Sequence, residues 1–250
     1  MSIERTSMAA KKRKKRRPQR VPSNTRHVPK KPTSDQLIQS EYEITDEPLD
    51  SPYLKRLPAQ VKDTLEDLYA KAQSQPKEAI PDLERLVATY PQVPMFSNYL
   101  SVAYSQVGDV EKSEACVLEA YRRHPTYLFA RVNYANICLQ KGDIAAIPEI
   151  FDHKLDLKLL YPRRKRFHVS EFTGFAGVMC RYYEAIGERD AAVIYYQILK
   201  RLAPRHPLTK QVKRLLYPPF WIRWLRQWAE KRLAEPTDKI QSQTETHRME

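Results

Sequence analysis

Few residues of this chain are arranged for catalysis or for metal binding. The six histidines stand at positions 27, 124, 153, 168, 206 and 247, and none has zinc-ligand spacing from another histidine or from a cysteine. The sequence also lacks a Gly-rich phosphate loop, a Gly-x-Ser-x-Gly motif and a His-Glu-x-x-His motif. We therefore expect no catalytic residue, no metal site, no cofactor and no small-molecule substrate, and we predict that the chain is not an enzyme.

The cysteines and the hydropathy pattern bear on location. Three cysteines, an odd number without paired spacing, fit a reducing compartment. No apolar run approaches the length of a membrane-spanning helix, and the first 20 residues lack the apolar middle of a signal peptide. We expect a cytoplasmic location, with nuclear and membrane-peripheral locations as the alternatives.

Basic side chains are concentrated rather than spread over the chain. Of a net charge of +13, residues 1–34 supply +11, from twelve Lys and Arg against one Glu. Such runs can neutralise phosphates, although solubility alone would also explain them. No aromatic residue interleaves with residues 11–20, so any nucleic-acid contact there would be nonspecific. The candidate contacts to an anionic partner are Lys11, Lys12, Arg13, Lys14, Lys15, Arg16, Arg17, Arg163, Arg164, Lys165 and Arg166.

The two ends of the chain have the composition of disordered segments. Residues 1–34 hold four prolines and few large apolar side chains, and residues 35–54 hold six acidic residues without Lys or Arg. The acidic stretch could fold back on the basic tail, but exposed ion pairs contribute little, which favours a solvated linker. We expect residues 1–54 and 236–250 to be disordered.

All three tryptophans lie near the end of the chain. Trp221, Trp224 and Trp228 follow two prolines at spacings that place them within about 60° of one another on a helix. Leu225 extends this apolar face, and residues 200–234 carry ten Lys or Arg against one Glu. We expect an amphipathic helix over residues 218–235 whose tryptophan face caps the preceding helical domain. A membrane-interface helix and a protein-docking helix are the alternatives.

The elements that position these side chains follow from a 34-residue repeat. Gly108 and Gly142 are 34 residues apart and each precedes an Asp, and Pro91 and Pro125 have the same separation. Gly187 lies 45 residues beyond Gly142, which is one period plus an 11-residue insertion at about residues 159–169. Apolar residues spaced by three and four flank each glycine. The pattern predicts an all-α chain of helix hairpins, with glycine as the left-handed cap between two helices.

These features resemble the tetratricopeptide repeat (TPR) family. The family pattern has a large apolar residue, a small residue, Tyr, Gly, Ala, an aromatic residue, Ala and Pro at fixed positions. Counted from position 94, the matching residues are Leu100, Ser101, Tyr104, Gly108, Ser113, Val117, Ala120 and Pro125. Counted from position 173, they are Met179, Cys180, Tyr183, Gly187, Ala192, Tyr196, Leu199 and Pro204.

Two further stretches match the pattern in part. Counted from position 128, the matching residues are Tyr134, Ala135, Cys138, Gly142, Ile147 and Phe151. Upstream, the matching residues are Ala79, Leu83, Leu86 and Pro91. The resemblance covers about residues 60–205 and implies an α-solenoid of antiparallel helix hairpins, which we expect over residues 58–217. Pro81 and Pro148 predict that the second helices of two hairpins begin late, and the insertion should bulge from one edge.

The resemblance also implies positions for the cysteines and for a binding groove. Cys138 and Cys180 stand at packing positions, which favours burial over catalysis. The pattern does not indicate whether Cys116 is buried or exposed. In the family, the first helices line a groove that receives an extended peptide or a helix. The groove positions are held here by Asn98, Val102, Ser105, Asn136, Leu139, Arg181 and Glu184. Asn can both donate to and accept from a peptide backbone. The alternative is that part of this set is merely solvated.

One TPR subtype grips the terminal carboxylate of heat-shock chaperones with lysines, an arginine and asparagines. The corresponding places hold Asn98, Val102, Asn133, Gly174 and Val178. Because the lysines and the arginine are missing, the resemblance does not extend to that subtype.

The sequence thus predicts a non-enzymatic scaffold or adaptor that binds a partner peptide or helix in the groove. The alternative is a peripheral membrane- or RNA-associated factor, recruited by the basic tail and the Trp- and Arg-rich C-terminal helix.

Overall fold

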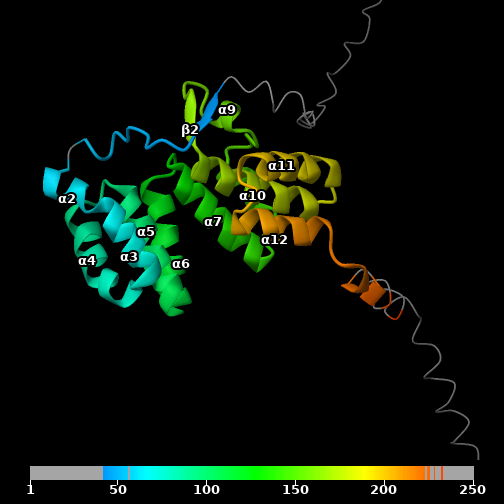
Figure 1. The fold of residues 1–250 in the computed structure, drawn as a ribbon, viewed down its shortest axis with the longest axis horizontal. Helices are drawn as coiled ribbons and strands as arrows, with labels where there is room; N and C mark the ends of the chain where they lie inside the picture. Colours follow the sequence, from blue (N-terminus) through cyan, green and yellow to red (C-terminus); the bar gives the residue numbers. More distant parts are fainter. Residues whose placement is uncertain (1–41, 56, 223, 226–227, 229–231, 233–250) are drawn as a thin grey trace, which may run out of the picture. The chain divides into compact units, whose positions relative to one another are not determined.

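The computed structural model describes residues 42–55, 57–222, 224, 225, 228 and 232. Within them the fold is mostly helical, which confirms an all-α chain in outline (Figure 1). The expected basic tail of residues 1–34, with the candidate contacts at positions 11–17, lies outside the described residues. So does the expected disordered segment of residues 236–250.

The helices follow one another with short connections. In the first half of the fold they are α2 (Ala59–Asp63), α3 (Leu65–Ser74), α4 (Pro76–Thr89), α5 (Pro94–Val107) and α6 (Val110–Arg123). In the second half they are α7 (Leu128–Lys141), α8 (Ala146–Ile150), α9 (Leu157–Leu160), α10 (Val169–Ala185), α11 (Arg189–Leu202) and α12 (Pro207–Leu216). None of the described helices is long and apolar enough to cross a membrane.

The repeated glycines are the turns between paired helices. Gly108, Gly142 and Gly187 have φ values of 82°, 77° and 78°, in the left-handed region that glycine adopts without strain. After α5, the amide of Asp109 donates to the carbonyl of Tyr104, and the Asp109 side chain then caps α6 by accepting from the amide of Lys112 at 3.1 Å. This confirms the glycine turns predicted from the 34-residue period.

Buried apolar side chains form two clusters. The N-terminal core lies among α3, α4 and α5 and includes Leu65, Leu68, Ala79, Leu83, Phe96 and Leu100. The C-terminal core lies among α7, α8, α10, α11 and α12 and includes Leu128, Ile147, Phe151, Phe175, Tyr195 and Leu216. At the edge of the C-terminal core, the ring of Tyr121 on α6 stacks on that of Tyr134 on α7, with centroids 4.8 Å apart.

Contacts also run between helices that are not consecutive in the chain: α3 packs on α5, α5 on α7, α7 on α10, and α10 on α12. Two glycines of α10 allow the last two of these approaches. A Cβ atom on Gly174 would lie 3.1 Å from Cγ1 of Val132 on α7. A Cβ atom on Gly177 would lie 2.2 Å from Cδ2 of Leu208 on α12, which is a clash. Because Gly174 and Gly177 carry no side chain, α7 and α12 can approach the backbone of α10 closely.

The prolines inside the second helices behave differently. Pro148 lies in the first turn of α8, which is only five residues long, in keeping with a shortened helix. Pro81 lies inside α4, which runs from Pro76 to Thr89, so the expected late start of this helix is wrong. Pro76 begins the helix instead, where its missing N–H would have had no intrahelical partner.

The acidic stretch of residues 35–54 is not entirely a solvated linker, and this corrects the sequence-based expectation. Strand β1 (Glu43–Thr45) pairs in parallel with β2 (Arg166–His168) of the insertion (Figure 1). Phe167 of β2 is fully buried, and the ring of Tyr42 packs edge-on against it at 5.0 Å. The acidic segment thus packs on the basic insertion rather than staying free, and the insertion is not a free bulge.

Candidate functional site

The first candidate site is a row of polar side chains across α5, α7 and α10. Asn133 of α7 donates from Nδ2 to Oδ1 of Asn98 on α5 at 2.6 Å. One turn further along α7, Asn136 accepts from Nη2 of Arg181 on α10. The stacking of α5, α7 and α10 thus brings Asn98, Asn136 and Arg181 into one row. Asn133 joins them, although the sequence named it only among the positions of the chaperone-binding subtype.

Arg181 and Glu184 lie one turn apart on α10 and carry unused hydrogen-bonding capacity. Glu184 accepts from Nη1 of Arg189 at 2.8 Å through one oxygen only. The other oxygen, Oε2, and the Nε of Arg181 are buried without a hydrogen-bond partner among the described residues. Burial away from water lowers the pKa of the Arg181 guanidinium from its usual value. The pair therefore holds one unmet donor and one unmet acceptor.

This arrangement can bind a group that both donates and accepts. A buried polar atom without a partner costs about 1–3 kcal/mol, which a ligand recovers by supplying the missing hydrogen bond. Nε of Arg181 needs an acceptor and Oε2 of Glu184 needs a donor. One residue of an extended peptide presents its own N–H and C=O on the same side of the chain, and an Asn or Gln side chain carries both groups on one carboxamide, so either could match the pair. We name the row Asn98, Asn133, Asn136, Arg181 and Glu184 the polar row.

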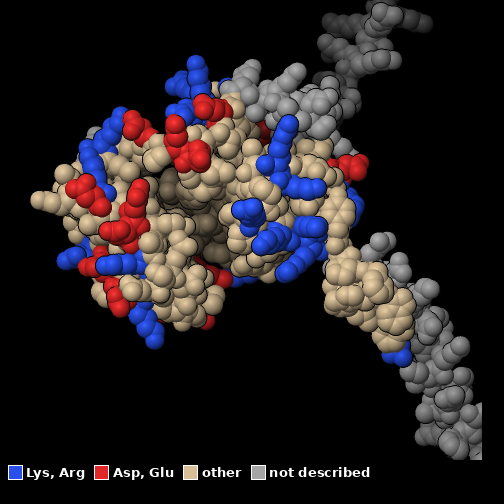
Figure 2. Space-filling view, in the orientation of Figure 1, with Lys and Arg blue, Asp and Glu red and all other residues tan. Residues whose placement is uncertain are grey.

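The other groove candidates differ in what they can contribute. Val102 is half-buried on α5, and Ser105 is exposed near the end of that helix. Leu139 is partly buried and packs against the C-terminal core, so much of its side chain is already used in folding. In the view of Figure 2 the surface is hollowed where α7 lies, between α6 and α12.

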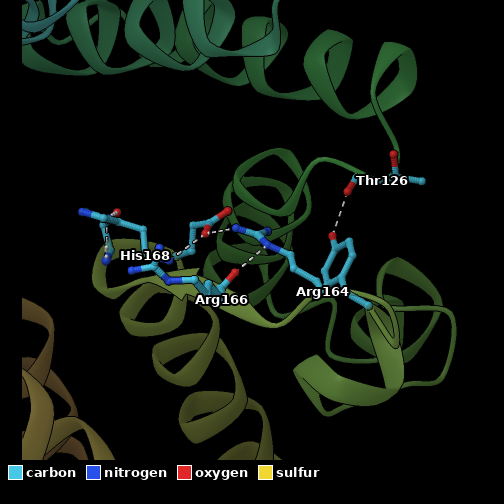
Figure 3. A network of polar contacts seen from close by, with 7 residues as sticks. Thr126, Arg164, Arg166 and His168 are labelled. Atoms are coloured by element: carbon cyan, nitrogen blue, oxygen red, sulfur yellow. Dashed lines mark hydrogen bonds and ion pairs between the residues drawn. The ribbon is translucent and has the colours of Figure 1, made fainter. Parts of the chain in front are cut away.

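The basic insertion is engaged within the fold at two of its four cations. Figure 3 shows the part of this network around Arg164, which also donates to the carbonyl of Arg166. Arg164 pairs with the buried carboxylate of Glu171, and its guanidinium lies 4.3 Å from the ring centroid of Phe167. Arg166 pairs with Glu43 at 3.2 Å and with Glu47 at 2.9 Å. Arg164 and Arg166 are therefore not free for an anionic partner, contrary to the sequence-based expectation. Glu171 of α10 already pairs with Arg164, and Glu43 of β1 and the nearby Glu47 already pair with Arg166.

His168 joins the same network to the start of α10. Its Nδ1 accepts from the amide of Ser170 at 3.2 Å, while its Nε2 donates to the carbonyl of Asp46 at 3.2 Å. Its backbone amide donates to Glu171 at 3.0 Å, which completes a capping box. Arg163 and Lys165 are exposed and have no ion pair among the described residues, so they remain candidate anionic contacts.

The tryptophan segment does not cap the helical domain in the structure. Trp221, Trp224, Leu225 and Trp228 are all exposed, by 45–61%. The end of the domain is covered instead by α12, whose Val212 and Leu216 are buried in the C-terminal core. Capping was the preferred expectation for the tryptophan face, and it is wrong because α12 already occupies that position. Phe220, 83% exposed, adds to the free apolar surface and was missing from the sequence-based set.

The cysteines are set for packing. Cys138 and Cys180 are buried, as predicted, and Sγ of Cys180 donates to the carbonyl of Ala192 at 3.1 Å. Burial raises the pKa of the Cys180 thiol to about 12 and that of Cys116, half-buried, to about 11. These thiols are therefore protonated at neutral pH. Among the described residues, no three His, Cys, Asp or Glu side chains are grouped to hold a metal ion.

Comparison with known proteins adds no family: no family model matches the chain, and no curated protein or solved structure matches it either. The case for function therefore comes from the geometry above.

Proposed function

We propose that this chain is a non-enzymatic scaffold whose polar row binds an extended peptide or a partner helix. The observation that carries the proposal is the pair of buried, unpartnered atoms on α10, Nε of Arg181 and Oε2 of Glu184. A fold gains nothing from leaving these atoms without partners, and a partner main chain would satisfy both once the two side chains turn toward it, because neither atom is exposed in the free chain.

The arrangement of the helices supports the same proposal. The succession of packed helices α3, α5, α7, α10 and α12 is what an α-solenoid of TPR-like hairpins would produce. In such a solenoid the first helices of each hairpin share one face, and the polar row lies on three of them. The cytoplasmic location expected from the sequence stays a prediction.

A peptide-display experiment tests this function. Random-sequence peptides are selected on the full chain, and the affinity of the selected peptides is measured by fluorescence anisotropy. Replacing Arg181 by Met removes the charged donor but keeps an apolar stem. We expect Arg181→Met to weaken binding by about tenfold or more, the effect of losing a hydrogen bond to a charged group. Asn136→Ala should weaken it as well, because it removes the acceptor that orients Arg181.

The matched control is Arg122→Met, which removes an exposed arginine of α6 outside the polar row. It should leave the affinity unchanged. Selected peptides that bind the Arg181→Met variant as tightly as the unmodified chain would show that the polar row is not the binding site.

A further inference from the structure

A second surface, separate from the polar row, lies just beyond α12. Phe220, Trp221 and Trp224 are 83%, 52% and 61% exposed, and Leu225 and Trp228 are exposed by 46% and 45%. These residues have helical backbone, at spacings that put Trp221, Trp224, Leu225 and Trp228 on one side of a helix. An exposed apolar face of this size, built from large aromatic rings, is uncommon on a surface that meets only water.

The chain beside this segment is strongly basic. Residues 191–229 contain no Asp or Glu. On α12 the apolar stripe of Val212 and Leu216 is buried, which leaves Lys210, Lys213 and Arg214 exposed. None of these three cations forms an ion pair within the described part of the chain. Figure 2 shows basic side chains gathered over α12, without acidic ones among them.

The covalent connection keeps the two features together. Only residues 217–219 separate the end of α12 from Phe220. Because an extended residue spans at most about 3.6 Å, the cations of the last turn of α12 stay within roughly 20 Å of the aromatic segment. A flat surface that takes up the aromatic rings can therefore also come into direct contact with the cations of α12, and such contact is needed because salt screens exposed charges beyond about 10 Å.

We propose that Phe220, Trp221, Trp224, Leu225 and Trp228 lie in the interface of an anionic lipid bilayer, with the cations of α12 against its headgroups. Tryptophan prefers the headgroup depth of a bilayer, and an amphipathic helix with basic flanks binds where anionic lipid supplies the opposite charge. Lys and Arg near such a surface each add to the attraction. The surface thus fits a membrane by both its apolar face and its charge, and the chain becomes a scaffold held at a membrane.

The tryptophans themselves report on this contact. The chain has three, and all of them lie in the segment, at positions 221, 224 and 228. The full chain is titrated with vesicles of equal parts phosphatidylglycerol and phosphatidylcholine, and tryptophan emission and acrylamide quenching are recorded. We expect a blue shift and protection from quenching with these vesicles, weaker at high salt, and little change with phosphatidylcholine alone.

Two pairs of variants test the two parts of the surface while keeping all three tryptophans. Leu225→Asp places a charge on the apolar face and should abolish the blue shift, whereas Leu159→Asp, at an exposed leucine of α9, should not. Reversing the charge of Lys210, Lys213 and Arg214 to Glu should weaken vesicle binding by at least about tenfold. Reversing the exposed Lys62, Lys71 and Lys77 in the same way gives an equal change in net charge and should have a smaller effect.

Several results would overturn the proposal. Emission that is already blue-shifted and protected without vesicles, and does not change with them, would mean that the segment packs on its own chain. Vesicles that pellet the protein without changing its emission would place the contact in the basic residues 1–34. A spectral change with a single-stranded RNA oligonucleotide but not with vesicles would assign the surface to nucleic acid. An equal change with neutral vesicles would remove the role of α12.

Discussion

The guanidinium of Arg131, in the first turn of α7, donates to the carbonyl oxygen of Ile150 at 2.9 Å and so ties α7 to the end of α8. Arg131 is only 5% exposed and also donates to the carbonyl of Pro125 and pairs with Asp152 at 2.9 Å. The contacts to Ile150 and Asp152 hold the short α8 and the turn after it, where Asp152 has a φ of 52°, whereas the contact to Pro125 holds the turn before α7. Arg131 thus stabilises the fold through satisfied contacts, whereas Arg181 of the polar row keeps a buried N–H without a partner.

The two arginines should respond differently to the same substitution. Arg131→Met leaves buried carbonyl oxygens without a donor, so we expect the free energy of unfolding to fall by about 3 kcal/mol. Arg181→Met removes a buried N–H that already lacks a partner together with one hydrogen bond to Asn136, so its cost should be smaller, about 1–2 kcal/mol. Urea unfolding followed by circular dichroism measures both. Equal losses would mean that Arg181 stabilises the fold as Arg131 does.

The insertion offers a second comparison. Arg164→Ala deprives the buried carboxylate of Glu171 of its cation, which should cost about 2 kcal/mol. Arg166→Ala breaks only exposed ion pairs with Glu43 and Glu47 and should cost less than about 1 kcal/mol. The two melting temperatures, measured at low and at high salt, give the test. A larger loss for Arg166→Ala would show that β1 is held mainly by charge.

The close approach of α12 to α10 can be tested at one glycine. Gly177→Ala puts a methyl group against the side chain of Leu208, and we expect a loss of about 1–2 kcal/mol from overpacking. Adding Leu208→Ala should recover part of this loss, since the two changes act on the same contact. Gly174→Ala, whose methyl group would lie 3.1 Å from Val132, is the milder control. Additive effects of Gly177→Ala and Leu208→Ala would contradict the contact.

Alkaline pH should destabilise the chain through its partly buried tyrosines. Burial raises the pKa of Tyr99, Tyr161 and Tyr183 to about 12, above the usual value of 10. The folded chain therefore keeps these protons more tightly than the unfolded chain does. Stability is complete below about pH 10 and falls as the pH rises from 10 towards 12. In denaturant unfolding as a function of pH, Tyr99→Phe should lessen this fall. Tyr217→Phe, at an exposed tyrosine, is the matched control.

Much of the helical layout could be predicted from the sequence because its signals are local. Gly108, Gly142 and Gly187 each mark a turn that requires positive φ, and the structure has these turns. The positions around them are packing positions: Leu100, Met179 and Leu199 are all buried. Spacing within one helix is enough to place such residues, since it depends on no distant part of the chain.

The parts that were missed depend on contacts between distant segments. Strand β1 has three residues in an acidic stretch, and its partner β2 lies in the insertion. Two features of the sequence are consistent with this pairing: the opposite charges of the two segments, and the alternation of Tyr42 and Ile44 with polar residues. Neither feature indicates which segment the strand pairs with. The role of α12 in covering the C-terminal core was also missed. The capping role was assigned to the tryptophan face, whereas Val212 and Leu216 of α12 are the residues that pack on the core.

The candidate site was foreseen by position but not by chemistry. Asn98, Asn136, Arg181 and Glu184 were placed on one face through the TPR resemblance. The sequence could not show that Arg181 reaches Asn136, or that Nε of Arg181 and Oε2 of Glu184 are left without partners. These facts depend on side-chain geometry across two helices, as does the pairing of Asn133 with Asn98.

The parallel pairing of β1 with β2 has a consequence for how the chain is made. Thr45 and Arg166, which this pairing brings together, are 121 residues apart, whereas the helices of each hairpin are neighbours in sequence. During synthesis the early hairpins can form as they leave the ribosome, because their contacts are local. The acidic strand has no partner strand until residue 168 has emerged, so this pairing can form only after the hairpins that precede the insertion have left the ribosome.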